Sequence, residues 1–316
     1  MGHFLLKQWF LIGIAGASVL AYFFPEWGDT LNKYGFFSVG IFLAFFITGL
    51  YLETRSIFRQ VQEFRAPVAA ACSSLILYPL LAWLMALPVL PYEFVIGVCI
   101  IGVGPVTVSS GTIMTAIARG NVPLSLCICI LTSFLAIFTI PLMLNILLSI
   151  GGKIELPVLK MVGGLILKVL VPIILGQIVR PFIKSVIQRI NSPLSVFQSC
   201  IIILIIFRAV SSSADNLNQA GTAMISIIVF MTFLHFFMLF INYGIANLLK
   251  LERPSITAFT IHTSQKTLTV TYIVWAGYFA HDYPMAFIPA IICQLIQMTV
   301  GTFVAEFFRK RALLQQ

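Results

Sequence analysis

Hydroxyl side chains gather around an interruption in one apolar stretch of the sequence. Gly102, Gly104 and Pro105 prevent a regular helix there, because proline removes a backbone donor and glycine favours angles that other residues avoid. The nearby hydroxyls belong to Thr107, Ser109, Ser110, Thr112 and Thr115. In hydrocarbon, such a break survives only against protein or a watery cavity, and transporters use such breaks to hold an ion or a substrate. The alternative is a proline kink whose hydroxyls bond to their own helix.

A second unusual stretch runs from residue 257 to residue 271, where ten of fifteen residues are polar. The polar residues fall on all faces of a helix, so this helix cannot face lipid. It contains Lys266, and a cation at mid-bilayer costs roughly 2.5–3.5 kcal/mol. Lys266 could pair with carbonyls, lose its proton or match an anionic ligand, and the alternative is that it snorkels to an interface. His262 is either a ligand or a satisfied core histidine.

The composition is that of an integral membrane protein. Hydrophobic residues make up 60% of the 316 residues and charged residues 9%, whereas a soluble domain carries about 25% charge. The mean hydropathy is +1.04. The six cysteines lie in apolar segments without metal-ligand or disulfide spacing, and they are expected to be small buried hydrophobes. No nucleophile triad, metal cluster or phosphate loop is present, so we expect neither an enzyme nor a resident cofactor.

Ten segments are long and apolar enough to span a bilayer, which takes about 20 residues. They run roughly over 6–24, 35–52, 67–87, 93–117, 122–149, 156–180, 193–213, 219–249, 254–279 and 284–307. Asn121 is expected to cap the helix that begins at residue 122.

The cations predict how these spans are oriented. With the N-terminus inside, cytoplasmic segments hold thirteen of the nineteen Lys and Arg residues, as the positive-inside rule requires. The net charge of +9 is therefore a topology signal and not a sign of nucleic-acid binding. We expect a multi-pass protein of the cell membrane with both termini cytoplasmic and the lipid bilayer as its surroundings.

Ten spans divide into two halves of five, roughly residues 1–150 and 151–316 of a single transporter unit. Because five is odd, equal halves must have opposite orientations. The broken span 93–117 then matches the polar span 254–279, and such matched anomalies in inverted halves indicate a transporter site. The predicted fold is an all-α integral membrane protein of two inverted five-helix repeats, in which these two spans, the fourth and ninth, are unwound and meet near mid-membrane.

Four motifs carry a resemblance to the bile acid:sodium symporter family. The run Phe45–Leu52 is similar to FFxxGLxL, and Pro105–Thr115 with Ala118–Asn121 is similar to PTTxSSNVxMT followed by GN. The run Ser264–Leu268 resembles the SQKSL of the sodium/bile acid cotransporter 7-like branch. The resemblance covers nearly the whole chain. It implies ten helices in a panel and a core domain, with helices 4 and 9 broken and crossing. It also implies transport of an organic anion that is often coupled to sodium.

Carried over residue by residue, the resemblance implies crossover ligands at Ser109, Ser110, Ser125 and Gln265. Three positions depart from the family pattern. Gly111 stands where the family usually has Asn, Cys129 stands where a Thr helps to bind sodium, and Ile261 replaces an acidic residue. Loss of that carboxylate removes the main charge compensation for a bound cation, and Lys266 instead supplies a fixed one.

The sequence therefore predicts a secondary transporter of an organic anion, bile-acid-like or another carboxylate or sulfonate, with sodium symport left open. The alternative is a non-transporting or sodium-independent member that regulates ion homeostasis from the membrane. The expected partners are a small organic anion and, if coupling is retained, a sodium ion. The candidate site comprises Pro105, Thr107, Ser109, Ser110, Thr112, Ser125, Cys129, His262, Thr263, Ser264, Gln265 and Lys266.

Overall fold

The computed structural model describes residues 9–51, 64–107, 109–150, 154–221 and 223–314, which form helices and no strand. The first half contains α2 (Trp9–Phe23), α3 (Pro25–Lys33), α4 (Phe36–Tyr51), α6 (Arg65–Cys72), the π-helical turn η2 (Ser73–Leu77), α7 (Tyr78–Ala86), α8 (Tyr92–Gly102), α9 (Ser109–Ile117) and α10 (Val122–Ile150). The second half contains α11 (Val158–Leu165), the π-helical turn η3 (Ile166–Leu170), α12 (Val171–Arg189), α13 (Asn191–Ala220), α14 (Ala223–Leu248), α15 (Arg253–Thr263), α16 (Leu268–Tyr278), the 3-10 turn η4 (Pro284–Phe287) and α17 (Ile288–Leu313).

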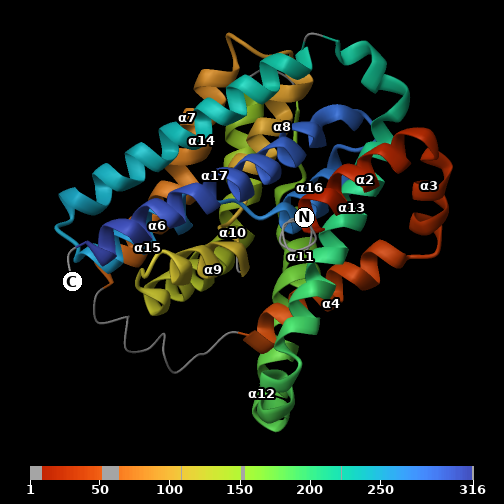
Figure 1. Ribbon diagram of the computed structural model, residues 1–316. Coiled ribbons are helices and arrows are strands. Elements are labelled where there is room, and N and C mark those ends of the chain that lie inside the picture. Colours follow the sequence, from red (N-terminus) through yellow and green to blue (C-terminus); the bar gives the residue numbers. More distant parts are fainter. Residues whose placement is uncertain (1–8, 52–63, 108, 151–153, 222, 315–316) are drawn as a thin grey trace.

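The helices pack into two groups (Figure 1). The panel consists of α2, α3, α4, α12 and α13, and the core group consists of α6 to α10 and α14 to α17. Each group takes helices from both halves of the chain. The first two predicted spans of each half lie in the panel, apart from α11 at the start of the sixth span, which packs against α10. The last three spans of each half lie in the core group.

Two glycines bring α4 and α12 of the panel into backbone contact. A Cβ atom on Gly49 would overlap the carbonyl of Ile173, and a Cβ atom on Gly176 would overlap the carbonyl of Phe46. The Gln177 side chain also donates a hydrogen bond to the Gly49 carbonyl. Small residues that allow such close approach are typical of helix contacts in membranes.

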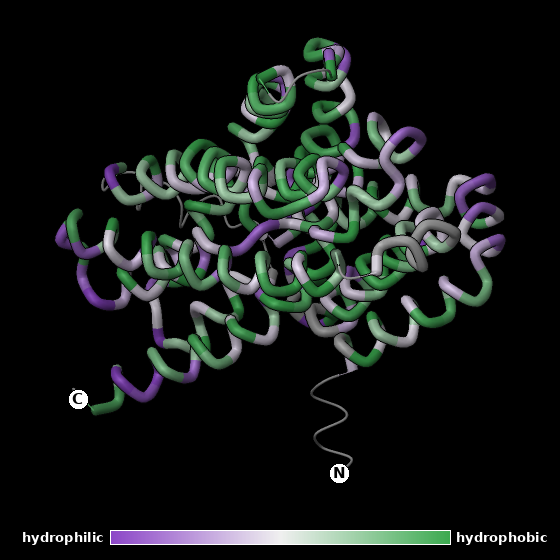
Figure 2. The backbone as a smooth tube through the Cα atoms, turned by 90° about the horizontal axis from the view of Figure 1, so that it is seen from above, coloured by the Kyte–Doolittle hydropathy of each residue, from purple (hydrophilic) through white to green (hydrophobic). Residues whose placement is uncertain are grey.

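Six of the described helices are long and apolar enough to cross a membrane, and α3 with α4, bent by 72°, would make a seventh. Figure 2 shows hydrophobic residues along most of each helix, with hydrophilic residues gathered at many helix ends. The other three predicted spans do not pass this length test. The described part of the first is the short α2, and the fourth and ninth are each divided into two short helices.

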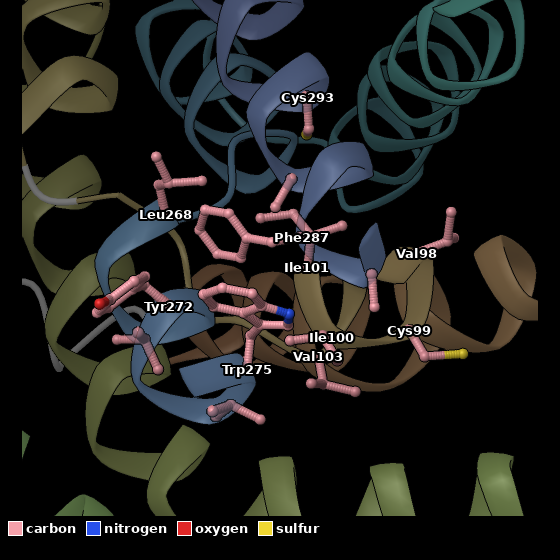
Figure 3. Packing of buried hydrophobic residues seen from close by; sticks show 14 of the residues in the cluster. Val98, Cys99, Ile100, Ile101, Val103, Leu268, Tyr272, Trp275, Phe287 and Cys293 are labelled. Carbon is pink, nitrogen blue, oxygen red and sulfur yellow. The ribbon is translucent and has the colours of Figure 1, made fainter. Parts of the chain in front are cut away.

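The hydrophobic core is centred where α8, α16 and α17 meet (Figure 3). The rings of Trp275 and Phe287 lie 5.1 Å apart, and the Tyr272 ring lies 5.8 Å from each. The indole nitrogen of Trp275 donates to the Tyr283 carbonyl at 3.1 Å, so its polar atom is satisfied. This packing fixes α16 against α8 beside the two breaks.

Most predicted spans coincide with helices to within a few residues. The helices of the seventh and tenth spans continue beyond the predicted ends, to Ala220 and Leu313, and two further regions differ. The segment predicted as a turn before residue 35 contains α3, whose Asp29 carboxylate pairs with Arg208 at 3.0 Å. The predicted end of the sixth span at residue 180 is wrong, because α12 continues to Arg189 through non-helical angles at Ile183. Asn121 caps α10 as predicted, accepting a hydrogen bond from the Leu124 amide at 3.0 Å.

Candidate functional site

Both spans that the sequence predicts to be broken are interrupted. The first break separates α8 from α9, and the second, Ser264–Thr267, separates α15 from α16. The breaks meet: the Thr267 amide donates to the Pro105 carbonyl at 3.0 Å. A backbone donor and a backbone acceptor, freed from their own helices, thereby satisfy each other.

Lys266 is fully buried where the two breaks meet. Its Nζ atom donates to the Ser74 carbonyl at 2.5 Å, to Ser74 Oγ at 2.9 Å and to the Gly104 carbonyl at 2.9 Å. It also lies 4.3 Å from the centre of the Tyr78 ring. These three oxygen acceptors match the three N–H donors of an ammonium group. The side chain therefore bridges both breaks to the third predicted span and does not snorkel.

The backbone of Lys266 is held by a glutamine of α17. Gln297 accepts from the Lys266 amide at 2.9 Å and donates to the Lys266 carbonyl at 2.8 Å. Its Nε2 atom also lies 2.7 Å from Gln294 Oε1. The side-chain amide thus replaces the helical partners that Lys266 would have in an unbroken helix.

Ser110 and Gln265 form a second link across the crossover. Ser110 Oγ donates to Gln265 Oε1 at 3.0 Å and lies 3.3 Å from Thr107 Oγ1. The Gln265 amide nitrogen lies 3.0 Å from Met114 Sδ on α9. The resemblance implied that Ser110 and Gln265 belong to one site, and the structure brings them into contact.

His262 forms a third link and uses both ring nitrogens. Nε2 lies 2.7 Å from the Thr107 carbonyl, and Nδ1 contacts Ser125 Oγ. Ser125 Oγ lies 3.4 Å from Thr112 Oγ1. A Cβ atom on Gly111 would lie 2.8 Å from the ring carbon Cδ2, so the imidazole packs against α9 because residue 111 has no side chain.

Three of the predicted site residues take no part in these links. Ser264 faces α14, where it accepts from Asn242 Nδ2 at 2.9 Å and donates to the Thr260 carbonyl. Cys129 Sγ has Ser133 Oγ at 4.0 Å, and the thiol packs in a small apolar cluster. The buried Thr263 hydroxyl has no hydrogen-bond partner among the described residues. The side chain of Ser109 lies outside the described residues.

A cavity of about 810 Å³ lies between the panel and the crossover. On the crossover side it is lined by Thr107, Ser110, Thr112, Thr267 and Gln294. On the panel side its lining includes Phe45, Thr48, Arg180, Lys184 and Ile202. None of the described lining residues is Asp or Glu. The space therefore combines apolar walls, hydroxyl groups and two cations.

A profile of the SBF-like CPA transporter family matches residues 8–310. The chain belongs to this family. Sodium/bile acid cotransporter 7 of Xenopus tropicalis is 26% identical over 328 residues, covering 99% of this chain and 94% of that protein. The rice (Oryza sativa subsp. japonica) protein named probable sodium/metabolite cotransporter BASS4, chloroplastic, is 27% identical over 315 residues, covering 94% and 74%. An uncharacterized protein of Pseudomonas aeruginosa is 29% identical over 208 residues, covering 65% and 62%.

The family predicted from the four motifs is thereby confirmed, and the matched residues include both breaks. Within this SBF-like member, several residues that contribute to the crossover were not among the predicted site residues. They include Gly104 and Thr267 in or beside the breaks, and Ser74, Asn242, Gln294 and Gln297 on other helices. The three amides are polar residues inside predicted spans, and that placement is a signal from which they could have been found. Ser74 carried no comparable signal, because a serine among small and apolar residues is ordinary in a membrane helix.

Proposed function

We propose that this SBF-like protein is a secondary transporter of a small organic anion that binds in the cavity between the panel and the core group. The observation that carries the proposal is the lining. Arg180 and Lys184 line the cavity, and no carboxylate occurs among its described lining residues. Apolar walls with a cationic pair fit an amphipathic carboxylate or sulfonate, because Arg and Lys bind such groups by charge-assisted hydrogen bonds. The names of the relatives, cotransporters of sodium with bile acid or a metabolite, support the same class.

For coupling, we infer that the Lys266 ammonium takes the place of a sodium ion. A buried sodium needs several oxygen ligands and usually a nearby negative charge. Here the Gly104 and Ser74 carbonyls already accept from Lys266 Nζ, and Ile261 stands where the family pattern has a carboxylate. A cation next to Lys266 would also be repelled at low dielectric. These oxygen atoms therefore suit a fixed ammonium better than an exchangeable metal ion.

In the membrane, we propose ten spans in two inverted sets of five, with both termini cytoplasmic in the cell membrane. The division of each half between the panel and the core group supports this arrangement. Impermeant labelling of a cysteine introduced near Gln316 tests it: protection from the outside is expected, and labelling from the outside would contradict the orientation.

Uptake by proteoliposomes tests the transport proposal. The probes are radiolabelled taurocholate and radiolabelled benzoate, supplied in sodium chloride and in choline chloride. We expect accumulation of at least one probe in both salts. If neither probe accumulates, the alternative function, regulation of ion homeostasis, would be favoured. If a probe accumulates only in sodium chloride, the protein would be a sodium symporter.

The cationic pair gives this experiment its matched variants. Arg180→Ala combined with Lys184→Ala should weaken apparent affinity by about tenfold or more, because each hydrogen bond to a charged group is worth about 1.5–3 kcal/mol. Arg189→Ala removes an exposed cation from the same helix, outside the cavity lining, and should leave uptake unchanged. Equal losses in the two variants would show that the cavity cations do not recognise the anion.

A further inference from the structure

Two buried histidines of the core group have opposite surroundings. Neither ring nitrogen of His235, on α14, has a hydrogen-bond partner among the described residues. His262, on α15, has a partner on each nitrogen and is fully buried. Neither residue is among those that line the cavity. Both imidazoles are buried, so what distinguishes His262 from His235 is its two hydrogen bonds.

The partners of His262 fix where its proton lies. The Thr107 carbonyl can only accept, so Nε2 must carry a hydrogen and donate it. In the neutral ring, Nδ1 is then an acceptor, and the Ser125 hydroxyl donates to it. A proton added to the ring can therefore bind only at Nδ1, on the side of Ser125.

Ser125 connects this nitrogen to the cavity. Its Oγ atom lies 3.4 Å from Thr112 Oγ1, and Thr112 is one of the residues that line the cavity. The three groups Thr112, Ser125 and His262 thus form a chain that runs from the cavity to a buried imidazole. Hydroxyl groups both donate and accept, so the bonds in this chain can reverse direction without any heavy atom moving.

We propose that His262 Nδ1 is a proton-binding site that exchanges protons with the cavity through Ser125 and Thr112. A proton from cavity water binds the Thr112 oxygen, the proton already on Thr112 passes to Ser125, and the proton on Ser125 passes to Nδ1. One proton enters, one N–H bond forms, and both hydroxyls are restored with their hydrogen bonds reversed. The return of the proton follows the same steps backwards.

The charged and titratable groups around His262 leave the added charge without a carboxylate partner. On the elements packed against α15 they are His235 and Tyr243 (α14), Cys127 and Cys129 (α10), Arg65 and Cys72 (α6), and Cys293, Glu306, Arg309, Lys310 and Arg311 (α17), while α9 has none. Along its own chain segment they are Arg253 and Lys266. Glu306 is partly exposed and paired with Arg309 at 2.7 Å.

An imidazolium at this place would therefore be stabilised by oxygen dipoles and by any anion in the cavity. An anion that favours the proton is itself favoured by the proton to the same extent, because coupling between two binding sites is reciprocal. This role in transport rests on the proposed function, whereas proton binding by His262 does not. The proton would travel with the anion in place of sodium.

Solid-state NMR of the full chain in lipid nanodiscs tests the site without any substrate. The protein carries four histidines, which are labelled with ¹⁵N. Their signals are assigned by replacing each histidine with Asn in turn. At about pH 8 we expect His262 to be the tautomer with hydrogen on Nε2, and towards about pH 4 its Nδ1 signal should become that of a protonated nitrogen. A neutral ring with hydrogen on Nδ1, or an Nδ1 that gains no proton over this range, would overturn the proposal.

The route is tested by the rate at which the Nδ1 proton exchanges with solvent. Thr112→Val keeps the shape of the side chain and removes the hydroxyl, and it should slow exchange about 10²-fold. Thr112→Ser keeps the hydroxyl and should exchange like the wild type. The His235 signals should be the same in all three proteins. Equal exchange in the Val and Ser variants would exclude this route, and it would leave the transport proposal untouched.

Discussion

The two breaks are made in different ways. Gly102, Gly104 and Pro105 interrupt the first through the backbone itself, whereas the second, Ser264–Thr267, contains neither glycine nor proline. The second is held open by side chains of other helices, with Gln297 on the Lys266 backbone and Asn242 on Ser264. A break of the first kind is a local property of the sequence, while one of the second kind depends on tertiary packing.

The breaks also differ in what they contribute to the crossover. The first offers carbonyl acceptors at Gly104, Pro105 and Thr107. The second segment provides their donors: the Lys266 ammonium, the Thr267 amide and, just before the break, the His262 ring. In these three bonds the donor belongs to the second half of the chain and the acceptor to the first. The comparison shows that a break rich in unpaired carbonyl groups can be satisfied by hydrogen-bond donors of the protein itself, without a bound cation.

Removing the strongest donor should have the largest effect. Lys266→Ala leaves the Ser74 and Gly104 carbonyls without their donor, and each unsatisfied buried group costs about 1–3 kcal/mol. We expect a loss of about 3 kcal/mol in unfolding free energy, measured by thermal unfolding in detergent. Lys266→Gln should remain folded. Arg189→Ala, which removes an exposed cation from the last turn of α12, is the control and should change stability by less than about 0.5 kcal/mol.

The same variant sharpens the proposal that an ammonium replaces sodium. In Lys266→Ala the vacated oxygen atoms become available to a metal ion, so sodium chloride should raise the unfolding temperature relative to choline chloride. The wild type should unfold alike in the two salts. Strictly sodium-dependent uptake that Lys266→Ala does not alter would contradict the replacement.

The second break should depend on Gln297. Gln297→Leu removes two bonds to the Lys266 backbone, so we expect a loss of about 2 kcal/mol and faster hydrogen exchange in peptides that contain residues 264–267. Gln297→Glu can still accept from the amide and should lie between the wild type and Gln297→Leu. Unchanged exchange in Gln297→Leu would show that the break does not need this side chain.

The contact between Gly111 and His262 should be next in size. In Gly111→Ala the new methyl group would lie 2.8 Å from the imidazole, and overpacking of this kind costs about 2 kcal/mol. The double variant Gly111→Ala, His262→Ala should lose less than the sum of the single variants. Gly163→Ala is the control, because a Cβ atom there meets nothing within 4 Å. Additive losses in the double variant would separate Gly111 from the histidine.

Pro105→Ala should have the smallest effect, about 0.5 kcal/mol. The substitution retains the carbonyl that accepts from the Thr267 amide, and Gly102 and Gly104 before it remain. Thermal unfolding measures the change. A loss as large as that of Lys266→Ala would mean that the proline ring, and not the set of acceptors, maintains the first break.

The sequence indicated both breaks, but through different residues, and it explained only the first. Glycine and proline mark the first directly, and the polar run marks the second without showing what holds it open. Ser74 could not be identified, because its partner Lys266 is 192 residues away and nothing local connects them. Gly111 was visible as a departure from the family motif. Its physical meaning required the position of His262, which only tertiary structure provides.

The glycine contact between α4 and α12 limits how this molecule can move. These helices come from opposite halves of the chain, and their backbones touch at Gly49 and Gly176. The two halves are thus in backbone contact within the panel. A rocking motion of one half against the other would have to break this contact. We therefore expect any alternation of access to be a sliding of the core group along an undivided panel, with the cavity at the boundary between them.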